Sequence, residues 1–196
     1  MSRASPWARL VRCRSGATAA EFALVVPLLL VLLLGIIDAG RLLWVVNRAE
    51  KAAQMGVRLA VVTDMVPADL AHRDFAAAHG VPSGEPVPVS AFSATTCSAG
   101  GCTGWGYDAA AFQRVVARMN AVLPDIRPGH VFIDYENVGL GYAGDPAGPD
   151  VSPLVRVRVR ALAFRPLLLA VFGSTIALPE ASAALTQEDG SGTGSN

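Results

Sequence analysis

A basic, polar stretch at the start of the chain gives way to a long apolar run. Residues 23–37 carry no charged side chain, and most of them are leucine, isoleucine or valine. A helix over residues 17–39 would be about 34 Å long at about 1.5 Å per residue, which is enough to cross the hydrocarbon core of a bilayer. Trp44 then falls where an aromatic side chain of a membrane–water interface would lie. The pattern predicts one membrane-spanning helix near the N-terminus.

The charges around this run predict its orientation. No acidic residue precedes Glu21, and the basic residues before it are Arg3, Arg9, Arg12 and Arg14. Basic residues beside a single span favour the cytoplasmic side for that flank. We therefore expect the N-terminus in the cytoplasm and everything after the span outside it.

The helical pattern continues beyond the apolar run. Residues 47–62 contain helix formers and no proline, so one helix over about residues 18–62, about 65 Å long, is expected. Ala52, Gly56 and Ala60 recur every four residues on one side of it. Such a stripe of small residues allows another backbone to approach closely. Either a second chain or the protein's own globular part suits this stripe.

The sequence after this helix alternates between short helical and strand patterns. We expect a short helix over 68–78 and a strand near 87–92, between several prolines and glycines. The clearest helix covers 107–123, where Asp108 can cap the N-terminus and the apolar residues form one face. Residues 131–138 resemble a strand. These elements together predict an α+β fold with an antiparallel sheet and one or two packed helices.

A second strand is expected at 155–164, because one set of its residues is apolar and the other is basic. The alternating residues are Val155, Val157, Val159 and Ala161 against Arg156, Arg158 and Arg160. The arginines could face acidic partners, lipid head groups or simply water. Residues 167–178 are apolar but too short to span a membrane, and we expect them to dock on the globular part.

The pattern divides the chain into four parts. Residues 1–16 form a basic cytoplasmic leader, and residues 17–63 form the transmembrane and extended N-terminal helix. Residues 64–186 form a globular head, which is α+β. Residues 187–196 are rich in glycine and serine and are expected to form a disordered tail.

The rest of the composition offers no residue for catalysis. The 16 basic and 16 acidic residues balance, so net charge favours neither nucleic acid nor an acidic substrate. The three histidines lie at no clear ligand spacing, and nucleotide-binding or nucleophile motifs are missing. We expect no enzymatic activity, no metal site, no cofactor and no nucleic-acid partner. Cys97 and Cys102 enclose a four-residue loop outside the membrane, which favours a disulfide over a zinc site.

Gly16 and Glu21 stand directly before the apolar run and allow two interpretations. Thr18 and Glu21 match a capping box that would begin the helix. Alternatively, cleavage after Gly16 would make Ala17 the N-terminus and Glu21 the fifth residue. The Glu21 carboxylate could then pair with the terminal ammonium of a neighbouring chain inside an apolar bundle. The two roles are compatible, because they use the same group at different stages.

Three segments in order resemble the TadE-like family, the pseudopilins of the tight-adherence (Flp-type) pilus system. These are GATAAEFALVVPLLL at 16–30, GIIDAGRLL at 35–43 and AAQMGVRLAVV at 52–62. The resemblance implies cleavage by a prepilin peptidase after Gly16, with Glu21 as the assembly carboxylate. It implies a minor pseudopilin in the inner membrane with a periplasmic or extracellular head. Its partners would be the prepilin peptidase, other pilins or pseudopilins and the assembly platform, and its role pilus assembly and surface adherence.

Two other readings of the same segments stay open. The chain could be an uncleaved single-pass anchor whose periplasmic head is a binding module. It could also be a secreted enzyme with a conventional signal peptide, although residues 37–39 make a poor cleavage site.

Overall fold

The computed structural model describes residues 14–145, 148–170, 173–187 and 192. The chain forms two compact units, which are described separately below. One unit contains Met1–Leu43 and Arg165–Thr175, and the other contains Trp44–Phe164 and Ile176–Asn196. The leader expected at residues 1–16 lies outside the described residues except for its last three.

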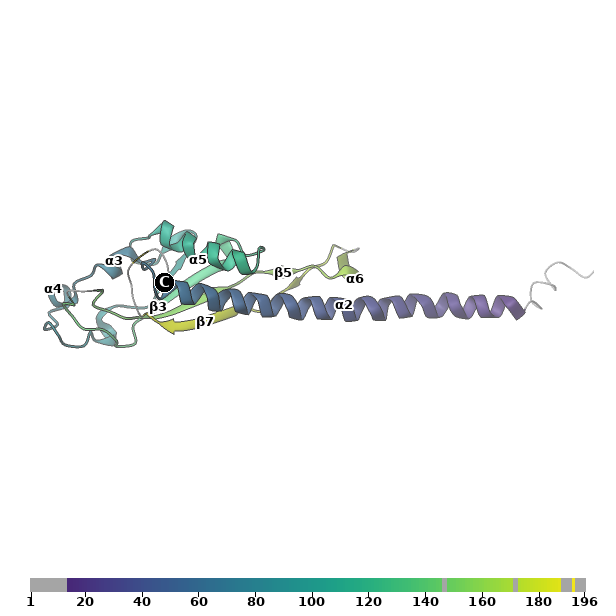
Figure 1. Ribbon diagram of the computed structural model, residues 1–196, viewed down its shortest axis with the longest axis horizontal. Coiled ribbons are helices and arrows are strands. Elements are labelled where there is room, and N and C mark those ends of the chain that lie inside the picture. Colours follow the sequence, from purple (N-terminus) through teal and green to yellow (C-terminus); the bar gives the residue numbers. More distant parts are fainter. Residues whose placement is uncertain (1–13, 146–147, 171–172, 188–191, 193–196) are drawn as a thin grey trace, which may run out of the picture. The chain divides into compact units, whose positions relative to one another are not determined.

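The long N-terminal helix predicted from the sequence is confirmed. Helix α2 covers Arg14–Ala60 without interruption, and Pro27 lies inside it (Figure 1). One helix of the described residues, Thr18–Ala60, is long and apolar enough to cross a membrane, with a mean hydropathy of 2.7 in its most apolar window. It indicates a single-pass membrane protein. The capping box is wrong for this chain, because Thr18 lies within the helix rather than at its start.

The larger unit is built on an antiparallel sheet, as expected, and the α+β class is confirmed. The strand order is β2-β1-β3-β4-β7, and a separate two-stranded sheet pairs β5 with β6. The strands are β1 Thr95–Ser98, β2 Gly101–Cys102, β3 Val131–Glu136, β4 Leu154–Val159, β5 Ala163–Phe164, β6 Ile176–Ala177 and β7 Ala181–Thr186. The central register places Ile133 opposite Val157. Both are fully buried, so the alternating apolar residues of β3 and β4 form the core side of the sheet.

The helix at 107–123 is confirmed with its cap. Helix α5 covers Ala109–Val122, and the Asp108 carboxylate accepts hydrogen bonds from the backbone N–H groups of Ala110 and Ala111. The other helices are short: α3 Ala68–Ala71, α4 Phe75–His79, α6 Leu167–Ala170, and the 3-10 turns η1 Val89–Ala91 and η2 Pro128–His130. The single helix expected over 68–78 is two helices, because the Asp74 side chain caps a new one by accepting from Ala77 N.

Two strand predictions are corrected. The strand expected at 87–92 is the turn η1, since prolines at 86 and 88 cannot donate to a ladder. The strand expected at 155–164 ends at Val159, because Ala161 adopts a positive φ of 58°, and the chain resumes as β5. Ala161 is exposed rather than part of the core.

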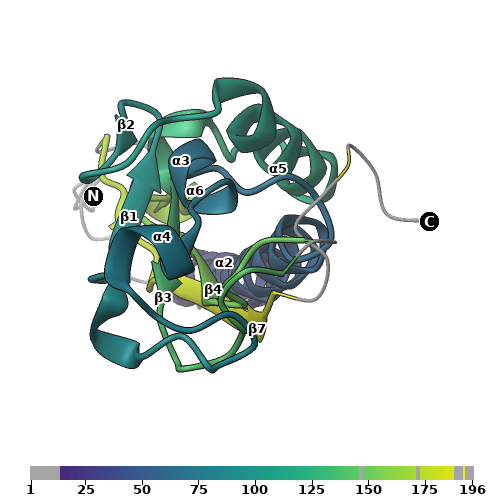
Figure 2. The same cartoon turned by 90° about the vertical axis from the view of Figure 1, so that its left-hand side faces the viewer.

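The core of this unit lies where α2 and α5 cover one side of the sheet (Figure 2). Ala52 and Ala60 are almost completely buried. A Cβ atom added to Gly56 would lie 2.7 Å from Met119 Sδ on α5 and 3.3 Å from Val157 Cγ1 on β4. The stripe of small residues therefore packs against the protein's own head, which is the second of the two uses expected for it.

Two residues of the segment expected to form a free tail are bonded to loops of the larger unit. Gln187 is buried, and its backbone N–H donates to the carbonyl of Pro153 at 2.9 Å. The Asp64 backbone N–H donates to the Gly192 carbonyl at 2.9 Å, and the Gly192 backbone N–H donates to Asp64 Oδ1 at 2.8 Å. The expectation of disorder is wrong for these two residues, because the loops beside β4 and after α2 supply partners. The rest of the tail lies outside the described residues.

Candidate functional site

Gly16 and Glu21 both lie on the exposed surface of α2. No heavy atom lies within 4 Å of a Cβ added to Gly16. The Glu21 side chain is exposed, and no salt bridge or hydrogen bond joins it to another described residue. When such a helix lies in a membrane or among other apolar helices, a carboxylate on its surface needs a partner for its charge. Both residues are thus accessible to another protein.

The helix surface that follows Glu21 is a continuous apolar face. Phe22 and Leu24 are 71% and 72% exposed, and Leu28 is 72% exposed. A soluble protein rarely leaves so many neighbouring apolar side chains in contact with water. This surface therefore requires lipid, or the apolar helices of other subunits, as its environment.

Asp38 is a second carboxylate in the helix, and sequence reasoning gave it no role. Its Oδ1 and Oδ2 atoms accept hydrogen bonds from the backbone N–H groups of Leu167 at 2.8 Å and Leu168 at 3.0 Å. Arg41 donates to Oδ1 at 2.9 Å. Asp38 is only 7% exposed, so these donors replace the water that its charge would otherwise require. One sequence signal could have identified Asp38. It is an acidic residue followed three positions later by an arginine, inside an apolar helix.

The structure bears out only part of the expectation for residues 167–178. The segment was expected to dock on the globular head. Its end does so, since Ile176–Ala177 forms β6 and pairs with β5 in the larger unit. Its start does not, because Leu167–Ala170 forms α6 within the same compact unit as the N-terminal part of α2. Asp38 supplies the acceptors that the first backbone N–H groups of a helix need. The anchor of α6 is thus a side chain about 130 residues earlier in the sequence.

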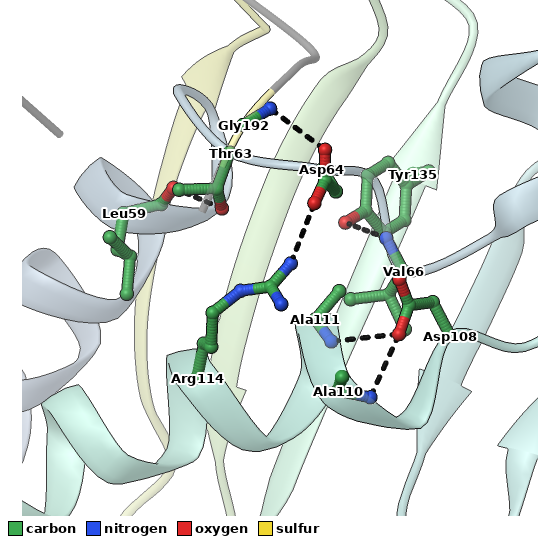
Figure 3. A network of polar contacts seen from close by, with 10 residues as sticks. All are labelled: Leu59, Thr63, Asp64, Val66, Asp108, Ala110, Ala111, Arg114, Tyr135 and Gly192. Atoms are coloured by element: carbon green, nitrogen blue, oxygen red, sulfur yellow. Dashed lines mark hydrogen bonds and ion pairs between the residues drawn. The ribbon is translucent and has the colours of Figure 1, made fainter. Parts of the chain in front are cut away.

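A network of polar contacts fixes the chain just after α2 (Figure 3). Asp64 binds Arg114 of α5 at 2.9 Å and Gly192 N at 2.8 Å. The Tyr135 hydroxyl accepts a hydrogen bond from Val66 N at 3.2 Å. Burial raises the pKa of Tyr135 above its ordinary value, because the anion would lose its hydration. These contacts join the end of the helix to α5 and to the sheet.

The arginines of β4 and Arg160, which directly follows it, form contacts within the head. Arg158 Nη2 donates a hydrogen bond to Asp134 Oδ1 at 2.6 Å, and this hydrogen bond raises the pKa of Arg158. Arg160 forms an ion pair with Glu180. Arg156 is exposed. Two of the three arginines are thus paired, and the basic row does not form a free cationic surface.

The cysteine pair forms the disulfide predicted from the sequence. Cys97 and Cys102 are joined, with their Cα atoms 4.0 Å apart, and they face each other in the β1–β2 hairpin. Cys97 is completely buried. The bond closes the edge of the sheet, so its role is structural. Within the described residues, no group of three or more histidines, cysteines or carboxylates could hold a metal ion.

One comparison with known proteins gives a match, and it falls on the helix that carries Gly16, Glu21 and Asp38. The family model described as TadE-like protein matches residues 16–58. The resemblance noted in the sequence is confirmed for this segment. No curated protein and no solved structure matches the chain.

Proposed function

We propose that this chain, whose residues 16–58 belong to the TadE-like family, acts as a pseudopilin-like membrane protein in the assembly of tight-adherence pili. The family match implies a role in this assembly, and pilus-related proteins of this family are generally not enzymes. The observation that carries the proposal is the position of the match. It covers the exposed apolar helix and both residues, Gly16 and Glu21, on which pseudopilin maturation and assembly would depend.

The proposed maturation divides the chain as the sequence suggests. A prepilin peptidase cuts after Gly16, so that residues 1–16 are removed and Ala17 becomes the N-terminus. Residues 17–63 anchor the protein in the inner membrane and then enter the assembly. Residues 64–186 form the head on the periplasmic or extracellular side. Exposure of Gly16 and the open space around it support access for the peptidase.

The proposed assembly step uses Glu21. Removal of the leader places a new ammonium within two helical turns of this carboxylate, and it removes the neighbouring arginines. Glu21 of one subunit then pairs with the ammonium of the next, because an isolated charge in an apolar bundle is costly. Other pilins or pseudopilins and the assembly platform are the partners, and surface adherence is the outcome.

Cleavage is tested by sequencing the N-terminus of the purified chain. We expect Ala17 to be first, and we expect Gly16→Leu to abolish processing, because the bulky side chain would block the peptidase. Gly40→Leu is the matched control, since Gly40 is also exposed and has no heavy atom near an added Cβ. A chain that starts at Met1 or Ser2 would support the uncleaved anchor instead, and a start near Gly40 would support secretion.

The pairing role of Glu21 predicts a separate result. Glu21→Gln should leave cleavage intact but lower the yield of assembled pili by more than about tenfold, because breaking a buried ion pair costs about 3–5 kcal/mol. Pili sheared from cells are quantified by immunoblot against the major subunit. Glu50→Gln, an exposed carboxylate on the same helix, is the control and should assemble normally. Normal pilus yield for Glu21→Gln would rule out the pairing role.

A further inference from the structure

Helix α6 carries apolar side chains that the protein leaves exposed beside its apolar helix. Leu167 is 47% exposed and Leu169 is 40% exposed. Residues 165–175 contain no acidic side chain, and Arg165 is their one charged residue. Ordinarily such leucines would be buried in a head domain. Here they belong to the same compact unit as the apolar part of α2.

The position of α6 along the helix gives the reason for this exposure. From Thr18 to Asp38 the helix rises about 30 Å, which equals the thickness of the hydrocarbon core. If Thr18 lies at one edge of the hydrocarbon core, Asp38 therefore lies at the opposite edge. A Cβ at Gly35, one turn before Asp38, would lie 3.9 Å from Leu168 Cδ1. Leu168 thus lies beside Gly35, within the apolar part of the helix.

We propose that α6 is a second, shallow membrane contact, held in the outer interface of the bilayer by Asp38. Leu167 and Leu169 insert among the lipids next to α2, and Arg165 reaches the head groups, as long basic side chains do at interfaces. Asp38 is a positioning residue, since it fixes the first two backbone N–H groups of α6 with both carboxylate oxygens. The inference rests on the proposed membrane-spanning role of α2.

The occupant of this surface is lipid rather than a second protein, because the surface continues the lipid-facing side of α2. On the side of the helix that carries Gly35 and Asp38, Leu24, Leu28 and Val31 are each at least 56% exposed. Leu167 and Leu169 extend this apolar face at its far end. The interface also suits the polar groups nearby, since Arg41 remains 45% exposed while it donates to Asp38. Charged side chains at the edge of the hydrocarbon core can extend into water while their backbone stays in the helix.

A fluorescent label tests the depth of α6 in the full-length protein. Cys13→Ser removes the free thiol of the native chain, while Cys97 and Cys102 stay joined in their disulfide. Leu169→Cys then supplies the one free thiol, which is labelled with NBD in vesicles of phosphatidylethanolamine and phosphatidylglycerol. We expect blue-shifted emission, protection from aqueous iodide, and stronger quenching by a lipid nitroxide near the head group than by one near the chain end. Labels at Leu29 and at the exposed Gln113 of α5 serve as the deep and the aqueous references.

The outcomes separate this inference from the function on which it rests. If the Leu169 label matches the Gln113 label while the Leu29 label stays deep, the interfacial contact is wrong and the membrane span stands. If the Leu169 label is shielded from iodide and from both lipid nitroxides, a protein covers α6 and the inference is also overturned. An aqueous Leu29 label would overturn both the span and the contact.

The positioning role of Asp38 has its own readout. In the Leu169-labelled chain, Asp38→Ala should lower quenching by the head-group nitroxide at least twofold, because α6 loses its anchor. Asp38→Asn should have a smaller effect, since its side-chain oxygen still accepts. The Leu29 label should not change in either variant. Unchanged quenching of the Leu169 label in Asp38→Ala would remove the positioning role.

Discussion

Replacing Gly56 by valine is expected to lower the free energy of unfolding of the head by about 2–3 kcal/mol. The added Cβ would lie 2.7 Å from Met119 Sδ and 2.8 Å from Met119 Cγ. Met119 is completely buried, and so is Val157 on the other side, so neither side chain has free space into which to move. The gain in helix propensity, less than about 1 kcal/mol, is smaller than the strain. Urea unfolding of the full chain in mild detergent, followed by near-UV circular dichroism, measures the change.

Gly40→Val is the matched control for this prediction, because it makes the same change on the same helix in open space. We expect it to alter the unfolding free energy by less than about 0.5 kcal/mol. Gly56→Ala should fall between the two, since it adds the clashing Cβ but no further methyl groups. Equal stability of Gly56→Val and Gly40→Val would mean that α2 does not pack on α5 and β4 as described.

Replacing Asp150 by alanine is expected to destabilise the head by about 2–4 kcal/mol, because three backbone N–H groups lose one common acceptor. Asp150 Oδ2 accepts from Phe75 N at 2.7 Å, and Oδ1 accepts from Gly144 N at 3.0 Å and Asp145 N at 3.1 Å. The residue is only 5% exposed, so water cannot fully replace it. The same urea titration measures the loss.

Asp150→Asn sharpens this prediction. An amide nitrogen would replace one of the two accepting oxygens and would face a backbone N–H, so this nearly isosteric change should also destabilise, by about 1–3 kcal/mol. Asp125→Ala removes an exposed carboxylate and should have little effect. If Asp150→Asn were as stable as the native chain, the carboxylate would not organise the loop between β3 and β4.

The elements that were predictable are those with a strong local pattern. The apolar run and the helix formers after it indicated α2, and the alternation of valine with arginine indicated β4. Asp108 marked the start of α5, because its capping role depends only on the next three residues. The prediction of a strand at 87–92 was wrong. Pro86 and Pro88 have no backbone N–H group to donate to a neighbouring strand.

For the candidate site, the sequence indicated Gly16 and Glu21 and offered two roles for Glu21, of which the structure does not support the capping role. Asp38 was overlooked because its partners, Leu167 N and Leu168 N, are backbone groups of a distant segment. Almost every residue has a backbone N–H group, so residue types do not show which of these groups will bond to a distant side chain. Sequence patterns therefore located the helix of the site but missed the contact between its far end and α6.

By itself the sequence determined the long apolar helix, its resemblance to the TadE-like family, the disulfide and the alternating strands. Each of these depends on residues close together in the chain, whose periodicity or spacing can be read directly. Tertiary structure alone decided that the stripe at Gly56 packs on Met119, that Gly192 binds Asp64, and that Asp38 holds α6. These contacts join segments far apart in the sequence, and folding selects them by close packing and by the need of buried polar groups for partners.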